Sequence, residues 1–138
     1  MADFNQMETA MNNLEIKATR YTPGVFFDAQ NHLLEIRGES YPEDVTEFYD
    51  PVFSWLEHYL RGLENQRVTM NISLIYFNSS SSKVLMDLFD MLEEAVEKQN
   101  DISINWIYDK EDVHIEECGK EFQEDFEVLR FNLVPAAG

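Results

Sequence analysis

The sequence predicts an α/β protein with a mixed sheet of about five strands and with helices mainly on one face of that sheet. Segments in which apolar and polar residues alternate follow segments with helical spacing of apolar residues. Helices connect the last three predicted strands, which makes these strands parallel with right-handed crossovers. The same strands alternate instead of being apolar throughout, so we expect one face of the sheet to be exposed to water.

The amino-terminal part is expected to be an arm followed by a hairpin. Residues 1–21 are polar with scattered apolar positions and are predicted to form a partly ordered arm, and residues 22–138 are predicted to form a single domain. Residues 25–27 and 33–37 read as the two strands of the hairpin. Gly38 is expected to end the second strand.

The first predicted helix follows the segment SYPE. Ser40 and Glu43 have the spacing of a capping box, or else Pro42 occupies the first helical position. Apolar residues then recur with helical spacing over residues 45–63. Pro51 interrupts this run, so either a second helix begins there or one helix kinks.

The rest of the chain alternates strands with helices, predicted over residues 67–77, 81–99, 102–109, 111–126 and 128–134. In the first of these strands, alternation places Tyr76 on the same face as Ile72, and Phe77 on the opposite face. The predicted topology is therefore an amino-terminal hairpin and a parallel β-α-β-α-β unit, joined by the first helix.

The composition limits the possible partners. The 138 residues include 27 acidic and 10 basic side chains, for a formal charge of −17. This charge disfavours binding to nucleic acid or to an anionic membrane and favours partners with basic surfaces. One cysteine, Cys118, excludes a disulfide within the chain. With no signal pattern and no apolar run of about 20 residues, a cytoplasmic protein is predicted.

The segment Asn78–Lys83, with the sequence NSSSSK, is the main candidate site. It is predicted to be a loop at the carboxyl end of a parallel strand, where α/β proteins usually carry functional groups. Capping the next helix needs only one such side chain, but five follow one another. A catalytic serine is disfavoured because no G-x-S-x-G motif and no suitably placed histidine are evident. A hydroxyl at a helix amino terminus suits phosphorylation, because free amides stabilise the added phosphate.

The helix after the serines has an apolar stripe and an acidic side. The acidic side is interrupted by an apolar residue, Met86. Such a face is usually only solvated. Alternatively it is a docking surface for a basic partner, to which an adaptable methionine would contribute. The predicted partner-binding residues are Met86, Asp87, Asp90 and Glu93.

No metal or cofactor site is predicted. His114 and Cys118 are four residues apart on a predicted helix and share a face, but zinc needs two more ligands. The many carboxylates are no evidence for acid–base catalysis in so acidic a chain, because such catalysis needs two in a cleft with displaced pKa values.

Five segments carry a resemblance to a known family: RGESYPED, FYDPVFSWLEHYL, LIYFNSSSSKVLMDLFDMLEEA, WIYDKED and GKEFQEDF. Together they cover most of residues 34–126. The chain resembles STAS-type anti-sigma-factor antagonists, and is more closely similar to the SiaC family of bacterial phosphoproteins. The resemblance implies a STAS-like fold and no catalysis by the chain itself.

The resemblance also implies control by partner switching. A dedicated kinase, using ATP and magnesium, would phosphorylate the loop, and a PP2C-type phosphatase would remove the phosphate. The unphosphorylated form would bind and activate a diguanylate cyclase, and so regulate cyclic di-GMP and biofilm formation. Two other interpretations stay open: a structural domain that self-associates through its polar sheet face, and a small serine hydrolase.

The acceptor implied by the resemblance is Ser79. The best-known member of the family carries a threonine acceptor in a segment Asn-Thr-Ser-Ser, and this chain has serine at the aligned position. The adjacent Ser80 and Ser81 are the alternatives. The other predicted members of the phosphorylation loop are Asn78, Ser80, Ser81 and Ser82, which would shape it, and Lys83, which would offset added charge.

Overall fold

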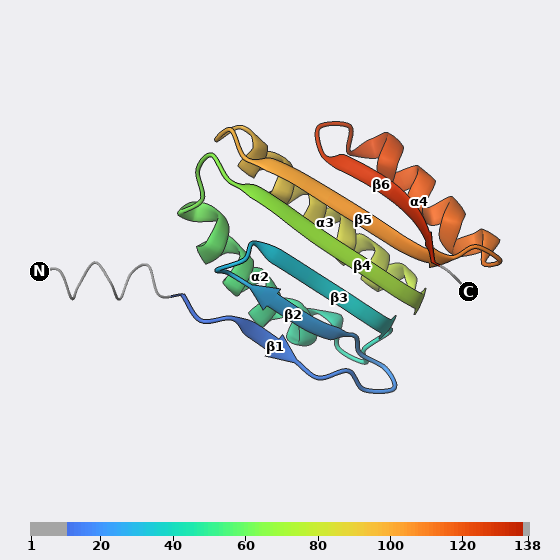
Figure 1. The fold of residues 1–138 in the computed structure, drawn as a ribbon. Helices are drawn as coiled ribbons and strands as arrows, with labels where there is room; N and C mark the ends of the chain where they lie inside the picture. Colours follow the sequence, from blue (N-terminus) through green and yellow to red (C-terminus); the bar gives the residue numbers. More distant parts are fainter. Residues whose placement is uncertain (1–10, 137–138) are drawn as a thin grey trace, which may run out of the picture.

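The computed structural model describes residues 11–136, which form one six-stranded sheet with three helices packed on it (Figure 1). The elements are β1 (Leu14–Ile16), β2 (Gly24–Asp28), β3 (Leu33–Ser40), α2 (Val45–Arg61), β4 (Arg67–Phe77), α3 (Ser79–Val96), β5 (Asp101–Asp109), α4 (Val113–Asp125) and β6 (Arg130–Ala136). None of the helices in this part of the chain is long and apolar enough to cross a membrane.

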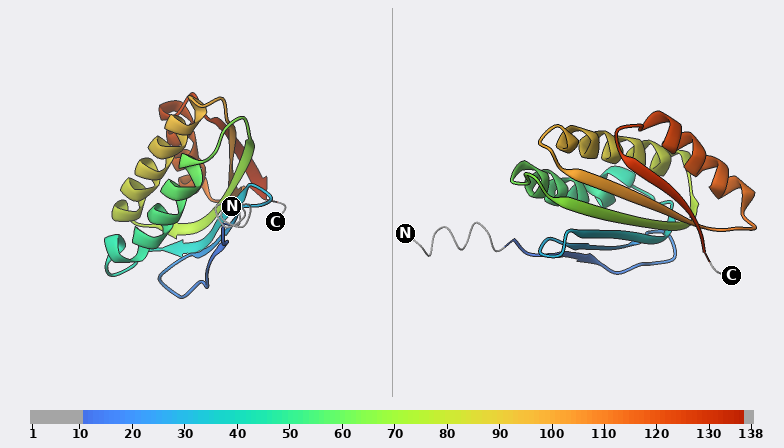
Figure 2. Two further views of the ribbon diagram at one scale, coloured as in Figure 1. Left: turned by 90° about the vertical axis from the view of Figure 1, so that its left-hand side faces the viewer. Right: turned by 45° about the horizontal axis from the view of Figure 1, so that its top comes forward.

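The strands lie in the sheet in the order in which they occur in the chain. β1, β2 and β3 pair antiparallel, whereas β3, β4, β5 and β6 pair parallel. Each parallel strand is joined to its neighbour by a helix, and all three helices cover the same face (Figure 2). The predicted α/β class and the placement of the helices are therefore confirmed. The carboxyl ends of the four parallel strands meet at one edge, which we call the carboxyl edge.

The sheet has one strand more than predicted. β1 lies within the predicted amino-terminal arm and pairs with Val25–Phe27 of β2. Leu14 and Ile16 pack against the core, while Glu15 faces away. Three residues are too few to show alternation, so the pattern did not reveal this strand. Residues 1–10 of the predicted arm lie outside the described residues.

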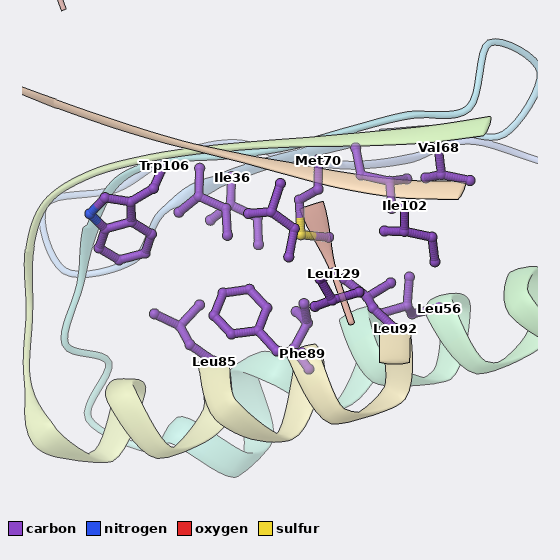
Figure 3. Close-up of a cluster of buried hydrophobic side chains, with 14 of the residues drawn as sticks. Ile36, Leu56, Val68, Met70, Leu85, Phe89, Leu92, Ile102, Trp106 and Leu129 are labelled. Atoms are coloured by element: carbon purple, nitrogen blue, oxygen red, sulfur yellow. The ribbon is translucent and has the colours of Figure 1, made fainter. Parts of the chain in front are cut away.

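The core lies between the sheet and the helices. Met70 of β4 and Trp106 of β5 point from the sheet toward Leu85 and Phe89 of α3 (Figure 3). The ring of Phe89 lies 5.2 to 5.5 Å from three other phenylalanine rings, in edge-on contacts. Burying a side chain of this size stabilises a fold by roughly 1.5–3 kcal/mol. The apolar stripe of α3 is thus core, and only its other side is available to partners.

The opposite face of the sheet is polar, as the alternation predicted. The side chains of three asparagines form a row across it: Asn105 donates to Asn71 at 2.8 Å, and Asn132 donates to Asn105 at 3.1 Å. The row follows the register, in which the three residues are direct neighbours on β4, β5 and β6.

The first helix starts later than predicted. α2 begins at Val45, because the side chain of Asp44 caps it by accepting a hydrogen bond from the amide of Glu47 at 3.0 Å. Neither Ser40 nor Pro42 begins the helix, and both predictions were wrong. The helix continues through Pro51, so no second helix starts there.

A bulge near the carboxyl edge changes the register of β4. β3 does not end at Gly38 but continues to Ser40. Gly38 pairs with Leu74 and the next residue, Glu39, pairs with Tyr76, so Ile75 is an extra residue in β4. Gly38 has a φ of 117°, which residues other than glycine rarely adopt.

The bulge reverses the two aromatic residues that follow it. The ring of Tyr76 turns to the open face and lies 5.4 Å from the ring of Tyr41. Phe77 turns inward, and its ring lies 5.8 Å from that of Trp106. Simple alternation predicted the opposite orientations. That prediction was wrong because the extra residue inverts the side chains that follow it in the strand.

Candidate functional site

The start of α3 contains the predicted phosphorylation loop. α3 begins at Ser79, two residues before the predicted start, so all four serines of the run are in the helix and not in a loop. Asn78 caps the helix: its side-chain oxygen accepts a hydrogen bond from the amide of Ser81 at 3.0 Å. The amide of Ser82 makes the first intrahelical bond, to the carbonyl of Asn78 at 2.9 Å. The amides of Ser79 and Ser80 precede these bonds and are left free by helix geometry.

The four serines have different environments. The side chains of Ser79 and Ser80 are exposed, whereas Ser81 is completely buried and Ser82 is half-buried. Lys83, one turn after Ser79, is also exposed. Only the first two serines of the run are therefore open to an enzyme that approaches from solvent.

Three buried hydroxyl groups hold the start of α3 in place. The hydroxyl of Ser81 donates to the carbonyl of Ser40 at 2.9 Å and lies 2.8 Å from the Ser40 hydroxyl. The Ser40 hydroxyl lies 2.6 Å from that of Tyr49. Because Ser81 uses its proton on the carbonyl, Ser40 donates to Ser81 and Tyr49 donates to Ser40. Burial raises the pKa of Tyr49, which keeps this donor protonated.

This network contains two residues that the sequence analysis did not assign to the site. Ser40 was interpreted as a helix cap, and Tyr49 as one of the apolar positions of a helix. The parallel arrangement could have indicated the contact between Ser40 and Ser81, because β3 and β4 are neighbours and both end at the carboxyl edge. Residues at or shortly after the ends of such strands lie close together, as Ser40 at the end of β3 and Ser81 in the first turn of α3 do.

The electrostatics at the start of α3 differ from those at the other two described helices. α2 and α4 are capped by Asp44 and Asp112 and carry a glutamate in the first turn. α3 is capped by an uncharged asparagine and has no acidic residue in its first turn. The positive end of its dipole is therefore not compensated by a carboxylate on the helix itself.

The predicted partner-binding residues lie on the same side of α3 as Ser79. Ser79, Lys83, Met86, Asp90 and Glu93 follow one another at spacings of four, three, four and three residues, which places them in one stripe. Met86 is 41% exposed, Asp90 is exposed and Glu93 is half-buried. Asp87 is exposed beside this stripe. We call these six residues the α3 surface, which extends over about 21 Å of helix.

The two candidate metal ligands are on α4, in a different part of the fold. The Sγ atom of Cys118 lies 3.9 Å from Nε2 of His114. Within residues 11–136, no group of three or more histidine, cysteine, aspartate or glutamate side chains is arranged to hold a metal ion. The pKa of Cys118 is raised by burial and by nearby carboxylates, so the thiol is not activated.

The comparison with protein families decides the relationship of the chain. A family model described as "SiaC family regulatory phosphoprotein" matches residues 16–136. The chain belongs to the SiaC family. The resemblance indicated by the sequence motifs is thereby confirmed.

Individual SiaC-like proteins match over nearly the whole chain. An uncharacterized protein of Pseudomonas aeruginosa strain UCBPP-PA14 is 37% identical over 116 residues, which are 83% of this chain and 90% of the relative. The crystal structure of apo-SiaC from Pseudomonas aeruginosa matches with a TM-score of 0.80 at 35% identity, covering 92% of this chain and 100% of that one.

A third match comes from a complex. The crystal structure of the diguanylate cyclase SiaD with its activator SiaC, from Pseudomonas aeruginosa, matches with a TM-score of 0.80. The identity is 34%, over 91% of this chain and 99% of that one. A protein with this fold and about a third of the same residues is thus the activator of a diguanylate cyclase.

Proposed function

We propose that this SiaC-family protein is a non-enzymatic partner-switching regulator in the cytoplasm. Its unphosphorylated form binds and activates a diguanylate cyclase. A dedicated kinase, which brings its own ATP and magnesium, phosphorylates Ser79, and a PP2C-type phosphatase restores the active form. The complex between SiaC and the cyclase SiaD supports the choice of output partner.

The observation that carries this proposal is the exposed hydroxyl of Ser79 on the first turn of α3. Free amides of the same turn and the uncompensated dipole are available to a phosphate on this side chain. The neighbouring Ser81 is a poor acceptor, because its buried hydroxyl is already hydrogen-bonded to Ser40. Ser80 is exposed, but helix geometry turns it about 100° away from Ser79 and from the stripe that contains Met86.

Phosphorylation is expected to change the surface and not the fold. A phosphate adds roughly −1.5 to −2 charges and a hydrated group at one end of the α3 surface. The buried bonds between Ser81, Ser40 and Tyr49 hold the backbone of this turn, and the exposed Ser79 side chain takes no part in them. A partner that covers the stripe would therefore meet the phosphate directly, by repulsion and by exclusion.

The proposal is tested by measuring cyclic di-GMP synthesis with the SiaD-type cyclase of the same organism. Ser79→Ala should activate the cyclase as wild type does and should no longer respond to the kinase. Ser79→Asp should weaken cyclase binding by about tenfold, because it places a charge in the contact surface. Gln30→Asp is the matched control, since it adds the same charge on the exposed β2–β3 turn.

Four results would contradict the proposal. Wild-type protein that neither binds nor activates the cyclase would remove the output function. A Ser79→Asp variant that binds like wild type, or a Gln30→Asp variant that binds equally weakly, would remove the role of position 79. Phosphate found only on Ser80 by peptide mass spectrometry would assign the switch to the neighbouring residue.

A further inference from the structure

The sheet divides at its carboxyl edge. β4 and β5 pair only from Arg67 and Asp101 up to Ile72 and Trp106. Beyond this point β4 continues to Phe77 in register with β3, and β5 continues to Asp109 in register with β6. The two central strands therefore separate, and each stays paired to its outer neighbour.

The bulge explains why β4 turns away from β5. The extra residue Ile75 lies three positions after Ile72, the last residue of β4 that pairs with β5, and a bulge increases the local twist of its strand. The bulge pairs with Gly38 and Glu39 of β3, so the twisted end of β4 remains attached to β3. Gly38, with its φ of 117°, allows β3 to follow this twist.

A cleft of about 370 Å³ lies at this division, within the size range of ligand sites in proteins. We call it the β4–β5 cleft; it is lined by Ser73–Ile75, Ile107–Asp109, Asp112, Ile115 and Ala136. The strand edges that face each other across it carry peptide groups that do not pair across the gap, and such groups are available to another chain.

The cleft combines apolar walls with an acidic rim. Ile75 at its mouth is 70% exposed, and Val113, which follows Asp112, is 63% exposed. Large apolar side chains exposed to this degree beside a hollow are typical of protein contact sites. Two carboxylates, Asp109 and Asp112, belong to the lining, and the chain as a whole carries a charge of −17.

We propose that the β4–β5 cleft is a second contact site for the output partner, separate from the α3 surface. It receives an apolar side chain of the partner that is followed or preceded by a lysine or arginine. The apolar side chain covers Ile75, and the basic group pairs with the carboxylates of Asp109 and Asp112. This inference rests on the proposed function for the identity of the partner, the diguanylate cyclase.

The exposed surface around the cleft favours a protein over a small molecule. Tyr76, next to Ile75 in β4, is 47% exposed, and its ring contacts Tyr41. The ring of Tyr41 in turn contacts that of Tyr21, which is 51% exposed. The apolar area thus continues out of the cleft across the open end of β3 and β4, farther than a ligand confined to the cleft would cover.

The test compares two exposed apolar residues at opposite edges of the sheet. Ile75→Asp places a charge at the mouth of the cleft. Val128→Asp is the comparison: Val128 is 58% exposed and precedes β6, at the amino ends of the parallel strands and thus opposite the carboxyl edge. Affinity for the cyclase is measured by calorimetry with unphosphorylated full-length protein. Ile75→Asp should weaken binding by about tenfold or more, and Val128→Asp by less than about twofold.

A second variant tests the charge without disturbing the fold. Asp109→Asn keeps the side-chain oxygen that accepts a hydrogen bond from the amide of Glu111 at 2.9 Å. It should weaken cyclase binding by about threefold at low salt, and this difference should shrink as salt is added. Circular dichroism melting curves for the three variants should match wild type and so exclude unfolding as the cause.

The outcomes separate this inference from the proposed function. If Ile75→Asp binds the cyclase as tightly as wild type while Ser79→Asp does not, the cleft is not a contact site and the switch stands. Equal losses for Ile75→Asp and Val128→Asp would also overturn the cleft, since the effect would follow charge and not position. If the wild-type protein itself does not bind the cyclase, the proposed function is wrong, and so is the assignment of the cyclase as the partner of the cleft.

Discussion

The starts of α3 and α4 are capped by the same kind of hydrogen bond but differ in charge. Each helix follows a parallel strand at the carboxyl edge, and each is capped by a short side chain that bonds to an amide in the first turn. Asn78 accepts from Ser81 at 3.0 Å, and Asp112 accepts from Ile115 at 3.1 Å. α4 adds Glu116 in its first turn, whereas α3 has no acidic residue there.

Helix stability alone does not explain this difference in charge between the two helix starts. Asparagine and aspartate are about equally good caps, so helix stability does not choose between them. An acidic residue would even interact favourably with the helix dipole. In a chain with 27 acidic residues, the uncharged start of α3 is explained if the negative charge arrives later, as a phosphate on Ser79.

The largest expected effect is the difference in unfolding free energy between aspartate substitutions at two serines of α3. Ser81→Asp should cost several kcal/mol of unfolding free energy, because it buries a carboxylate and disrupts the bonds to Ser40. Ser79→Asp should change the same quantity by less than about 0.5 kcal/mol, or stabilise slightly, because the site is exposed at a helix amino terminus. Urea denaturation of both variants measures the difference; equal stabilities would contradict the burial of Ser81.

The caps of the two helices should be equally important for stability. Asn78→Ala and Asp112→Ala should each lower the unfolding free energy by about 1 kcal/mol, because each leaves a first-turn amide without its partner.

The informative exchange is Asn78→Asp, which keeps the cap but adds a carboxylate at the uncharged start of α3. It should preserve stability and yet slow phosphorylation of Ser79 by the kinase. Phosphorylation at the wild-type rate would show that the missing carboxylate has no regulatory role.

A smaller effect is expected at alkaline pH from Tyr49, which donates to Ser40. Burial raises the pKa of Tyr49 above its ordinary value of 10.0. The contribution of Tyr49 to stability is therefore complete below about pH 10. It is lost as the pH rises above 10 toward the higher pKa of Tyr49 in the folded protein. Tyr49→Phe should be less stable than wild type at pH 7, and this difference should narrow above pH 10. Thermal melting between pH 7 and 11 measures this; a constant difference would argue against a buried, protonated Tyr49.

The class of fold followed from local patterns, because alternation and helical spacing are properties of neighbouring residues. The bulge at Ile75 was missed because Tyr76 and Phe77 are both aromatic, so the sequence is equally apolar in either register. β1 was missed because three residues show no period. In both cases the deciding contacts are with another strand, which a local pattern does not contain.

The candidate site was predictable only in part for the same reason. The exposed position of Ser79 and the stripe it shares with Met86 follow from helical spacing, once the start of α3 is known. That start was misplaced by two residues. The four consecutive serines look alike in sequence, and Ser81 differs only through its contact with Ser40, 41 residues away in the chain.

The central claim is that the start of α3 holds an anion site for the phosphate of Ser79. The most direct measurement is a phosphorus NMR titration of protein that carries phosphoserine at position 79, introduced by genetic code expansion. The second pKa of phosphoserine is about 6 in a flexible chain, and the folded protein should lower it, because free amides and Lys83 stabilise the dianion. The same protein unfolded in urea is the control. A folded value equal to the unfolded one, or above it, would contradict the account.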